Sequence, residues 1–221
     1  MKILSIAILI AVAGIAGCTY NIVKPAEFGG FLTNYHQLTK TTSANGSDTL
    51  RWVNATFTAK NYSGVQFQPV IFHPSPMVSE QVSSSALDDL KAYCTQKITH
   101  EAERAGLRNN TPGKGTVSVK MAITGVKVST EPLQPLEVIP FKLVLAAAGT
   151  VIGFRDKNLD IYFEIIGEDK STQEPLFNIV HKINGEQLDS KWDQMESKHV
   201  KKAFDQLSEK SIAALAKHLS L

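Results

Sequence analysis

Two segments in which apolar and polar residues alternate constrain the fold of this 221-residue chain most strongly. In residues 115–128, Val, Met and Ile side chains alternate with Ser, Lys, Ala and Thr. Residues 159–165 repeat the pattern, with Leu, Ile and Phe at every second position. A period of two is typical of a β-strand that buries one face. The sequence therefore predicts a sheet with one side on the core.

Further strands are predicted on both sides of these segments. Residues 168–171 have turn composition, so residues 176–183 are expected to return beside residues 159–165 as an antiparallel hairpin. Residues 49–53 and 65–72 are shorter strand candidates.

Two helices are also predicted. Ser85 and Asp88 have the spacing of a capping box, and Gly106 can end the helix in a left-handed conformation. A second capping-box candidate lies at residues 190–193. The expected apolar faces are Leu87, Leu90, Cys94, Ile98 and Ala105 in the first helix, and Trp192, Val200, Ala203, Phe204, Leu207, Ala214 and Leu215 in the second.

The order of these elements predicts an α+β fold. We expect a two-layer domain, with a mostly antiparallel sheet and the mid-chain and long C-terminal helices packed on one face. The expected organisation is a signal peptide at residues 1–17, a lipidated N-terminus, tether and irregular lead-in at residues 18–48, and a single domain at residues 49–221. Aromatic residues near residues 28–35 are expected to lie against that domain.

The N-terminus combines a short apolar run with a cysteine. Lys2 precedes apolar residues 3–16, which suit a signal peptide and fall short of the roughly 20 residues of a membrane-spanning helix. Residues 15–18 read Ile-Ala-Gly-Cys and resemble the bacterial lipobox. The resemblance implies cleavage between Gly17 and Cys18 and acyl chains such as palmitate on Cys18, with no other cofactor. A secretory signal with a coincidental cysteine and an uncleaved anchor are the alternatives.

The residue after the cysteine and the charge balance bear on location and partners. In lipoproteins of this kind an aspartate after the cysteine is associated with the inner membrane, so Thr19 favours the periplasmic face of the outer membrane. Removal of Lys2 leaves 22 of the 23 Lys and Arg residues against 21 Asp and Glu, which argues against a nucleic-acid partner. The other cysteine, Cys94, is expected to be an inert buried thiol.

A second apolar stretch, at residues 138–154, has two interpretations. Pro140, Lys142 and Gly149 interrupt it, so it is a poor membrane span. It is either a short helix buried between the sheet and the C-terminal helix or an exposed apolar flap that meets a partner or the lipid tied to Cys18. The side chains that would make that contact are Val138, Phe141, Leu143, Leu145, Val151 and Ile152.

Aromatic and glycine-containing patterns carry a resemblance to a known family. They are residues 28–32 with Tyr35 and Leu38, residues 50–54, residues 115–117, and residues 191–193 with Ala203 and Phe204. In these the chain resembles the domain-of-unknown-function family 3313, a family of bacterial lipoproteins. The resemblance implies a lipoprotein of the cell envelope and supplies no catalytic or binding residue.

The sequence nominates no catalytic or metal-binding residue. The six histidines, at 36, 73, 100, 181, 199 and 218, lack metal-ligand spacing, and residues 111–116 lack the spacing of a phosphate loop. We therefore expect a non-enzymatic binding or structural module with an envelope protein as partner. The alternatives are a carrier of a lipid or other apolar ligand under residues 138–154 and an envelope hydrolase whose site joins distant acids and histidines.

Overall fold

The computed structural model describes residues 22–78, 82–107, 115–130, 157–186, 188 and 195–219. Seven strands form one sheet, in the order β1-β2-β7-β6-β5-β3. The seventh strand, β4, pairs with a later part of β5, on the same edge as β3. The strands are β1 (Thr39–Thr42), β2 (Asp48–Val53), β3 (Tyr62–Phe67), β4 (Ile71–Phe72), β5 (Gly115–Thr130), β6 (Lys157–Asp169) and β7 (Pro175–Asn184). Short 3₁₀ helices, η1 (Pro25–Glu27) and η2 (Ala59–Asn61), precede β1 and β3.

The long central strands are the ones that the alternating pattern predicts. β5 pairs with β6, and β6 pairs with β7, in antiparallel registers, so the expected hairpin is confirmed. β1, β2 and β7 are also antiparallel to their neighbours, whereas β3 and β4 run parallel to β5. The sheet is therefore mostly antiparallel, and the α+β assignment is confirmed.

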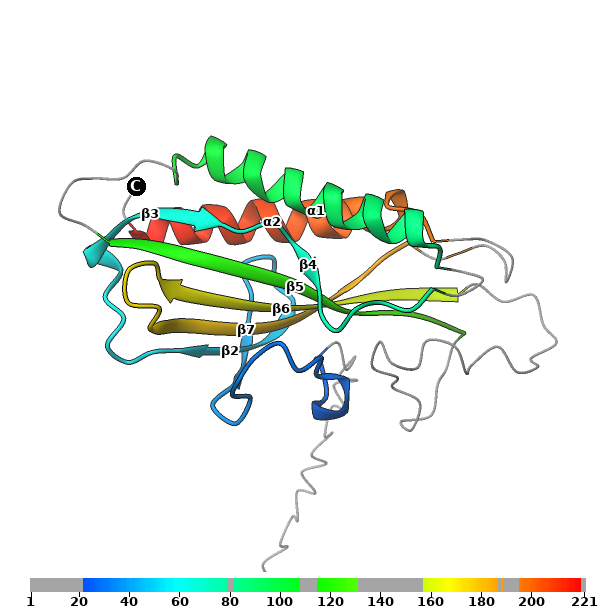
Figure 1. The fold of residues 1–221 in the computed structure, drawn as a ribbon, viewed down its shortest axis with the longest axis horizontal. Helices are drawn as coiled ribbons and strands as arrows, with labels where there is room; N and C mark the ends of the chain where they lie inside the picture. The colour runs from blue at the N-terminus through cyan, green and yellow to red at the C-terminus, as the bar shows by residue number, and fades with distance from the viewer. Residues whose placement is uncertain are drawn as a thin grey trace, which may run out of the picture.

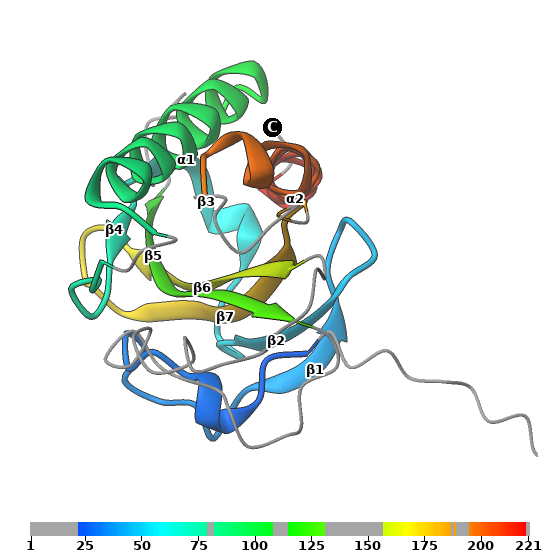
Figure 2. The ribbon, with the colours of Figure 1, turned by 90° about the vertical axis from the view of Figure 1, so that its right-hand side faces the viewer.

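Two helices, α1 (Ser84–Arg104) and α2 (Lys198–Leu219), lie side by side on one face of this sheet (Figures 1 and 2). The predicted apolar face of α1 is confirmed at Leu87, Leu90, Cys94 and Ile98, which are all buried. Gly106 has φ of +69° and follows the last turn, where its N–H donates to the carbonyl of Glu103. This is the left-handed helix end that the sequence predicts.

The N-cap residue of α1 differs from the one that the sequence predicts. Ser83, and not Ser85, precedes the helix and accepts a hydrogen bond from the N–H of Ala86 over 3.1 Å. Ser83 has extended φ and ψ, as an N-cap residue must, whereas Ser85 already lies in the first turn. The predicted capping box is therefore absent from its predicted position.

α2 begins later than the sequence predicts. Its first bond of the α-helical type runs from the N–H of Lys201 to the carbonyl of Ser197. The capping-box candidate at residues 190–193 lies outside the described residues. Of the predicted stripe, Val200, Phe204 and Leu207 are buried, and Ile212, Ala216 and Leu219 continue it to the end of the helix.

The predicted strand at residues 65–72 is two strands. Pro69 lies between β3 and β4 and has no N–H to donate to β5. The N–H of Val70 donates instead to Oγ1 of Thr95 on α1, over 3.0 Å. The ladder therefore breaks at Pro69 and resumes at Ile71.

The two faces of the sheet are covered differently. The main core lies between the sheet and the two helices and includes Phe163, Phe204 and Leu90. On the opposite face, Tyr162 and Val180 pack against Val23 and Leu32 of the chain's beginning. Residues 22–38, here called the N-terminal segment, thus form a thinner layer across the sheet from the helices (Figure 2). The lead-in, predicted to be irregular, also contributes β1 to the sheet.

Candidate functional site

Glu164 on β6 is a fully buried carboxylate that the N-terminal segment surrounds with donors. It pairs with Val180 on β7 and Ala122 on β5, on the face away from the helices, and its exposed fraction is 0%. Its Oε1 accepts a hydrogen bond from the N–H of Gly29 over 2.6 Å. Its Oε2 accepts from the N–H of Phe31 over 3.0 Å, from the N–H of Leu32 over 3.1 Å, and from the hydroxyl of Tyr35 over 2.6 Å. We call this arrangement the Glu164 cradle.

Two glycines allow the chain to wrap around the carboxylate. Gly30 has φ of +82°, a conformation that residues with a Cβ rarely adopt. Gly29 lies so close to β5 that an added Cβ would stand 2.3 Å from Cβ of Thr124. The ring of Phe28 then stacks on the ring of Tyr35, with centroids 4.3 Å apart. The aromatic residues near 28–35 do lie against the domain, as the sequence predicts.

The donors offset the cost of burying a charge. An unpaired carboxylate in an apolar interior costs several kcal/mol, whereas hydrogen bonds to a charged acceptor are about twice as strong as neutral ones. Burial, and secondarily the hydrogen bond to Glu164, raises the pKa of Tyr35, so its hydroxyl remains a donor. That oxygen also accepts from the N–H groups of Gly30 and Leu32. The cradle therefore fixes the N-terminal segment to the sheet, and its carboxylate is closed to solvent.

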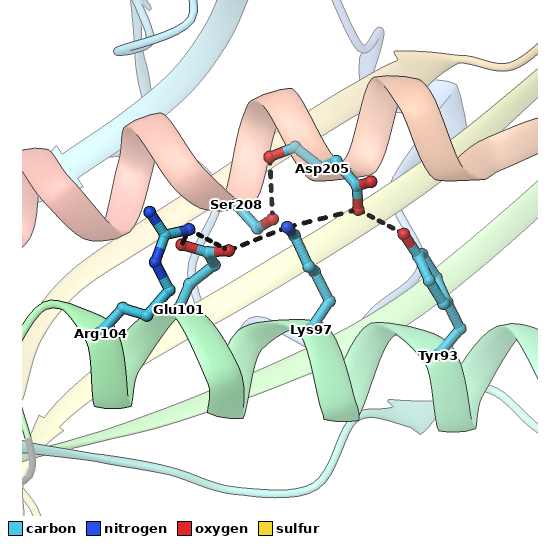
Figure 3. A network of polar contacts seen from close by, with 6 residues as sticks. All are labelled: Tyr93, Lys97, Glu101, Arg104, Asp205 and Ser208. Carbon is cyan, nitrogen blue, oxygen red and sulfur yellow. Dashed lines mark hydrogen bonds and ion pairs between the residues drawn. The ribbon is translucent and has the colours of Figure 1, made fainter.

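A second polar network joins the two helices (Figure 3). Nζ of Lys97 lies 2.8 Å from Oε1 of Glu101 and 3.8 Å from Oδ1 of Asp205 on α2. Arg104 donates to both oxygens of Glu101, over 3.1 and 3.0 Å. The hydroxyl of Tyr93 donates to Asp205, which belongs to the other helix. Tyr93, Lys97, Glu101 and Arg104 thus form one polar edge of α1 that faces α2.

The pKa shifts in this network follow from its contacts. The hydrogen bond from Lys97 lowers the pKa of Glu101 and raises that of Lys97 itself. Burial, followed by the bond to Asp205, raises the pKa of Tyr93. Each shift favours the protonation state that makes the contact, so the network acts as a connection between helices.

Asp169 holds the turn after β6. Its Oδ1 accepts from the hydroxyl and N–H of Ser171 and from the N–H of Thr172, and Oδ2 accepts from the hydroxyl of Tyr62 over 3.0 Å. These donors, with the Ser171 hydroxyl first, lower the pKa of Asp169. Burial, followed by the bond to Asp169, raises the pKa of Tyr62 to about 12.

Two buried groups in the helix-side core could carry chemistry. Cys94 is 0% exposed, and burial raises the pKa of its thiol, so the expected inert thiol is confirmed as buried. His181 pairs with Phe163 across β6 and β7 and is 2% exposed. Among the described residues neither of its ring nitrogens has a hydrogen-bond partner, and burial lowers its pKa to about 4. A neutral imidazole is therefore the buried form.

The hollows on the surface of the described part of the chain include two small ones. One, of about 290 Å³, lies between the end of β7 and α2 and is lined by Gly185, His199 and Gln206 among others. The other, of about 170 Å³, lies beside the first turn of α1 and is lined by Ser83, Asp89 and Glu196 among others. Within the described ranges, no group of three or more His, Cys, Asp or Glu residues could hold a metal ion.

The predicted site residues lie outside the described residues. These are Gly17 and Cys18 at the N-terminus, and Val138, Phe141, Leu143, Leu145, Val151 and Ile152 in the second apolar stretch. Sequence reasoning identified the glycines and aromatics of residues 28–35 but missed their partner, Glu164. In the sequence, Glu164 falls on the same side of β6 as Tyr162 and Ile166, and the alternation assigns that side to solvent. A charged residue at such a position was the only signal.

Comparison with known proteins gives one family match. The family model described as "Protein of unknown function (DUF3313)" matches residues 27–211. The uncharacterized lipoprotein YdcL of Escherichia coli (strain K12) is 31% identical over 203 residues, which are 92% of this chain and 91% of the relative. The lipoprotein of the same name from Escherichia coli O157:H7 is equally similar. No helix in the described ranges is both long and apolar enough to cross a membrane.

Solved structures resemble the chain at low sequence identity. The hypothetical protein CT253 from Chlamydia trachomatis has a TM-score of 0.39 at 10% identity, covering 72% of this chain and 98% of that protein. The PelC dodecamer from Paraburkholderia phytofirmans has a TM-score of 0.29 at 10% identity, covering 76% of this chain and 95% of that one.

Proposed function

Because the chain belongs to the DUF3313 family and its relative YdcL is a lipoprotein, we propose that it is a lipid-anchored protein of the bacterial cell envelope. The observation that carries this proposal is the 31% identity to that lipoprotein over 92% of the chain. The lipobox resemblance at residues 15–18 agrees with it. In this proposal, the bond between Gly17 and Cys18 is cleaved and the thiol of Cys18 carries the lipid. Two or more acyl chains anchor a protein stably, whereas one gives only marginal binding.

We place the domain at the periplasmic face of the outer membrane, on the basis of Thr19. The domain acts there as a non-enzymatic module that binds or supports another envelope protein. In support, three carboxylates make hydrogen bonds that hold parts of the fold together. They are Glu164, Glu101 and Asp169. A general acid or base must reach a substrate, and Glu164 and Glu101 are buried.

The lipid anchor is tested by intact mass of the protein extracted from the membranes of a bacterium that makes it. We expect loss of residues 1–17 and a gain of acyl mass at Cys18. Cys18→Ser is the matched control, because it keeps the size of the side chain and removes the thiol that accepts the lipid. It should remain an unmodified precursor. An unmodified Cys18 in the wild-type protein would overturn the anchor.

Location and partner need separate measurements. Separation of inner from outer membranes on a density gradient should place the wild-type protein in the outer-membrane fraction, and recovery with the inner membrane would contradict the Thr19 argument. Crosslinking in intact cells, followed by purification, should recover a second envelope protein. Recovery of the bait alone, with and without crosslinker, would exclude the binding role.

A further inference from the structure

The N-terminal segment joins the folded domain very close to Cys18. Val23 is only 4% exposed and packs with Leu32, Tyr162 and Val180 on the sheet. Cys18 precedes Val23 by five positions. An extended chain advances at most about 3.3–3.6 Å per residue, so the two Cα atoms are no more than about 18 Å apart. A lipid on Cys18 must therefore stay near the face of the sheet that the N-terminal segment covers, here called the covered face.

The N-terminal segment cannot serve as a flexible spacer between Cys18 and the domain, because its contacts hold it to the sheet. The Glu164 cradle binds residues 29–35 through four hydrogen bonds. Six positions after Val23 the chain is thus already fixed to β6. Nearer to Val23, the hydroxyl of Tyr162 donates to Oε1 of Glu27 over 3.0 Å. The free length between Cys18 and the fold is set by the few residues before Val23.

The helices are too far from this segment for the same lipid to bring them to a membrane. A helix with its side chains is about 10–12 Å thick, and stacked layers lie about 10 Å apart. The outer surface of α1 and α2 is therefore more than about 20 Å from the N-terminal segment, across the sheet (Figure 2). That separation exceeds the greatest length of the link.

We propose that the face of the sheet covered by the N-terminal segment lies against the phospholipid headgroups, with α1 and α2 pointing away from the membrane. This orientation rests on the lipid anchor proposed above. The occupant of the covered face is then the bilayer surface itself, and the helices are the surface that remains open to a protein partner.

The side chains on the covered face fit this orientation. On the covered face, Glu164 is buried and Glu27 accepts bonds from the Lys24 N–H and Tyr162, so both carboxylates are satisfied internally. Ile71 pairs with Ala122 on the same face and is 46% exposed, which gives an apolar contact for the interface. The helices expose charges of both signs, so the orientation rests on the short link and not on the charge of the helices. The exposed carboxylates are Asp88, Asp89, Glu103 and Glu209, and the exposed cations are Arg104, Lys198, Lys201, Lys202, Lys210 and Lys217.

Quenching of fluorescent labels tests the orientation in the complete lipidated protein. Labels are placed on single cysteines in four variants: Thr33→Cys and Ile71→Cys on the covered face, and Asp88→Cys and Lys210→Cys on the helices. The buried thiol of Cys94 serves as the unlabelled background. Each protein is bound to vesicles of phosphatidylethanolamine and phosphatidylglycerol that contain lipid with a nitroxide on its headgroup. We expect several-fold stronger quenching at Thr33 and Ile71 than at Asp88 and Lys210.

Two controls separate this inference from the lipid anchor. Equal quenching at all four sites, or stronger quenching on the helices, in protein whose intact mass includes the acyl chains would overturn the orientation alone. Absence of acyl mass would overturn the anchor and the orientation together. Insertion of about 20 Gly and Ser residues after Thr19 should reduce the difference between the faces, because such a linker spans about 5–6 Å times the square root of its length. A difference that persists unchanged would exclude the short link as its cause.

Discussion

The hydroxyl of Tyr35 donates a 2.6 Å hydrogen bond to Oε2 of Glu164, although the two residues are 129 positions apart in the sequence. This contact connects the beginning of the chain to the middle of its longest hairpin. Three backbone N–H groups complete the coordination of the same carboxylate. The position of the N-terminal segment on the sheet therefore depends on one side chain of β6, that of Glu164.

Tyr35→Phe should destabilise the protein by about 1.5–3 kcal/mol, because hydrogen bonds to charged groups contribute about that much. The change also removes the acceptor for the N–H groups of Gly30 and Leu32. Urea unfolding measures the loss, and hydrogen exchange should show faster exchange of the amides in residues 29–32. His36→Ala, at an exposed neighbour, should change neither. Unaltered exchange in Tyr35→Phe would contradict a role for the hydroxyl in holding the segment.

Glu164→Gln should cost about 2–4 kcal/mol, because the new amide group presents N–H donors to other donors and leaves buried groups unpaired. The readout is again urea unfolding, accompanied by limited proteolysis of the N-terminal segment. Glu209→Gln, at an exposed position on α2, is the control and should be nearly neutral. Equal stability of the two variants would exclude the cradle as a stabilising element.

Gly29→Ala should destabilise the protein, because the added methyl group would overlap Thr124 at 2.3 Å. A shift of either backbone would lengthen the bond from the Gly29 N–H to Glu164, and overpacking of this kind costs about 1–3 kcal/mol. Thr124→Gly removes the atoms in the way. The double variant should therefore lose less stability than the sum of the single variants. Simple additivity would show that the two residues are not in contact.

His181 should make stability depend on pH below neutrality. Its pKa is about 4 in the folded protein and about 6.5 in the unfolded chain, so between these values the unfolded chain binds a proton that the native state does not. Stability should fall as the pH drops from 6.5 toward 4, by up to about 3 kcal/mol. Unfolding free energies at pH 7 and 5 measure the effect. His181→Leu should flatten this part of the profile, while His36→Gln should leave it intact, and a profile unchanged in His181→Leu would refute the assignment.

Lys97→Met should cost about 1–3 kcal/mol, because Glu101 would keep only the exposed Arg104 as a partner while remaining 4% exposed. Replacement of both Lys97 and Glu101 by Met should be much less harmful, since no buried charge is then left unpaired. Lys198→Met removes an exposed pair with Glu196 and should leave stability unchanged. Thermal unfolding of the three variants gives the comparison. A double variant that is less stable than Lys97→Met would contradict this account.

The sequence predicts those parts of the fold that depend on local periodicity. The alternation in β5 and β6 and the spacing of Leu87, Leu90, Cys94 and Ile98 in α1 reflect a single buried face, and the structure has these elements where expected. The predicted strand at residues 65–72 ran through Pro69, whereas in the structure the ladder breaks there, just after the N–H of Gln68 donates to the carbonyl of Val119 on β5. Local pattern cannot supply such a distant partner.

The Glu164 cradle was beyond prediction for the same reason. Alternation divides β6 into a core face and a presumed solvent face, and a glutamate on the second face is unremarkable. The structure covers that face with the N-terminal segment, so the same residue becomes the most enclosed carboxylate of the described chain. The aromatic residues near 28–35 were expected to lie against the domain, but the sequence does not identify the residues that they contact.

The separation of the cradle's parts along the chain also determines when it can form. Gly29 is made 135 residues before Glu164. At synthesis rates of about 5–20 residues per second, this gap lasts on the order of ten seconds. During that interval the N-terminal segment lacks the carboxylate that fixes it to the sheet. The step that closes the cradle therefore comes after the emergence of β6.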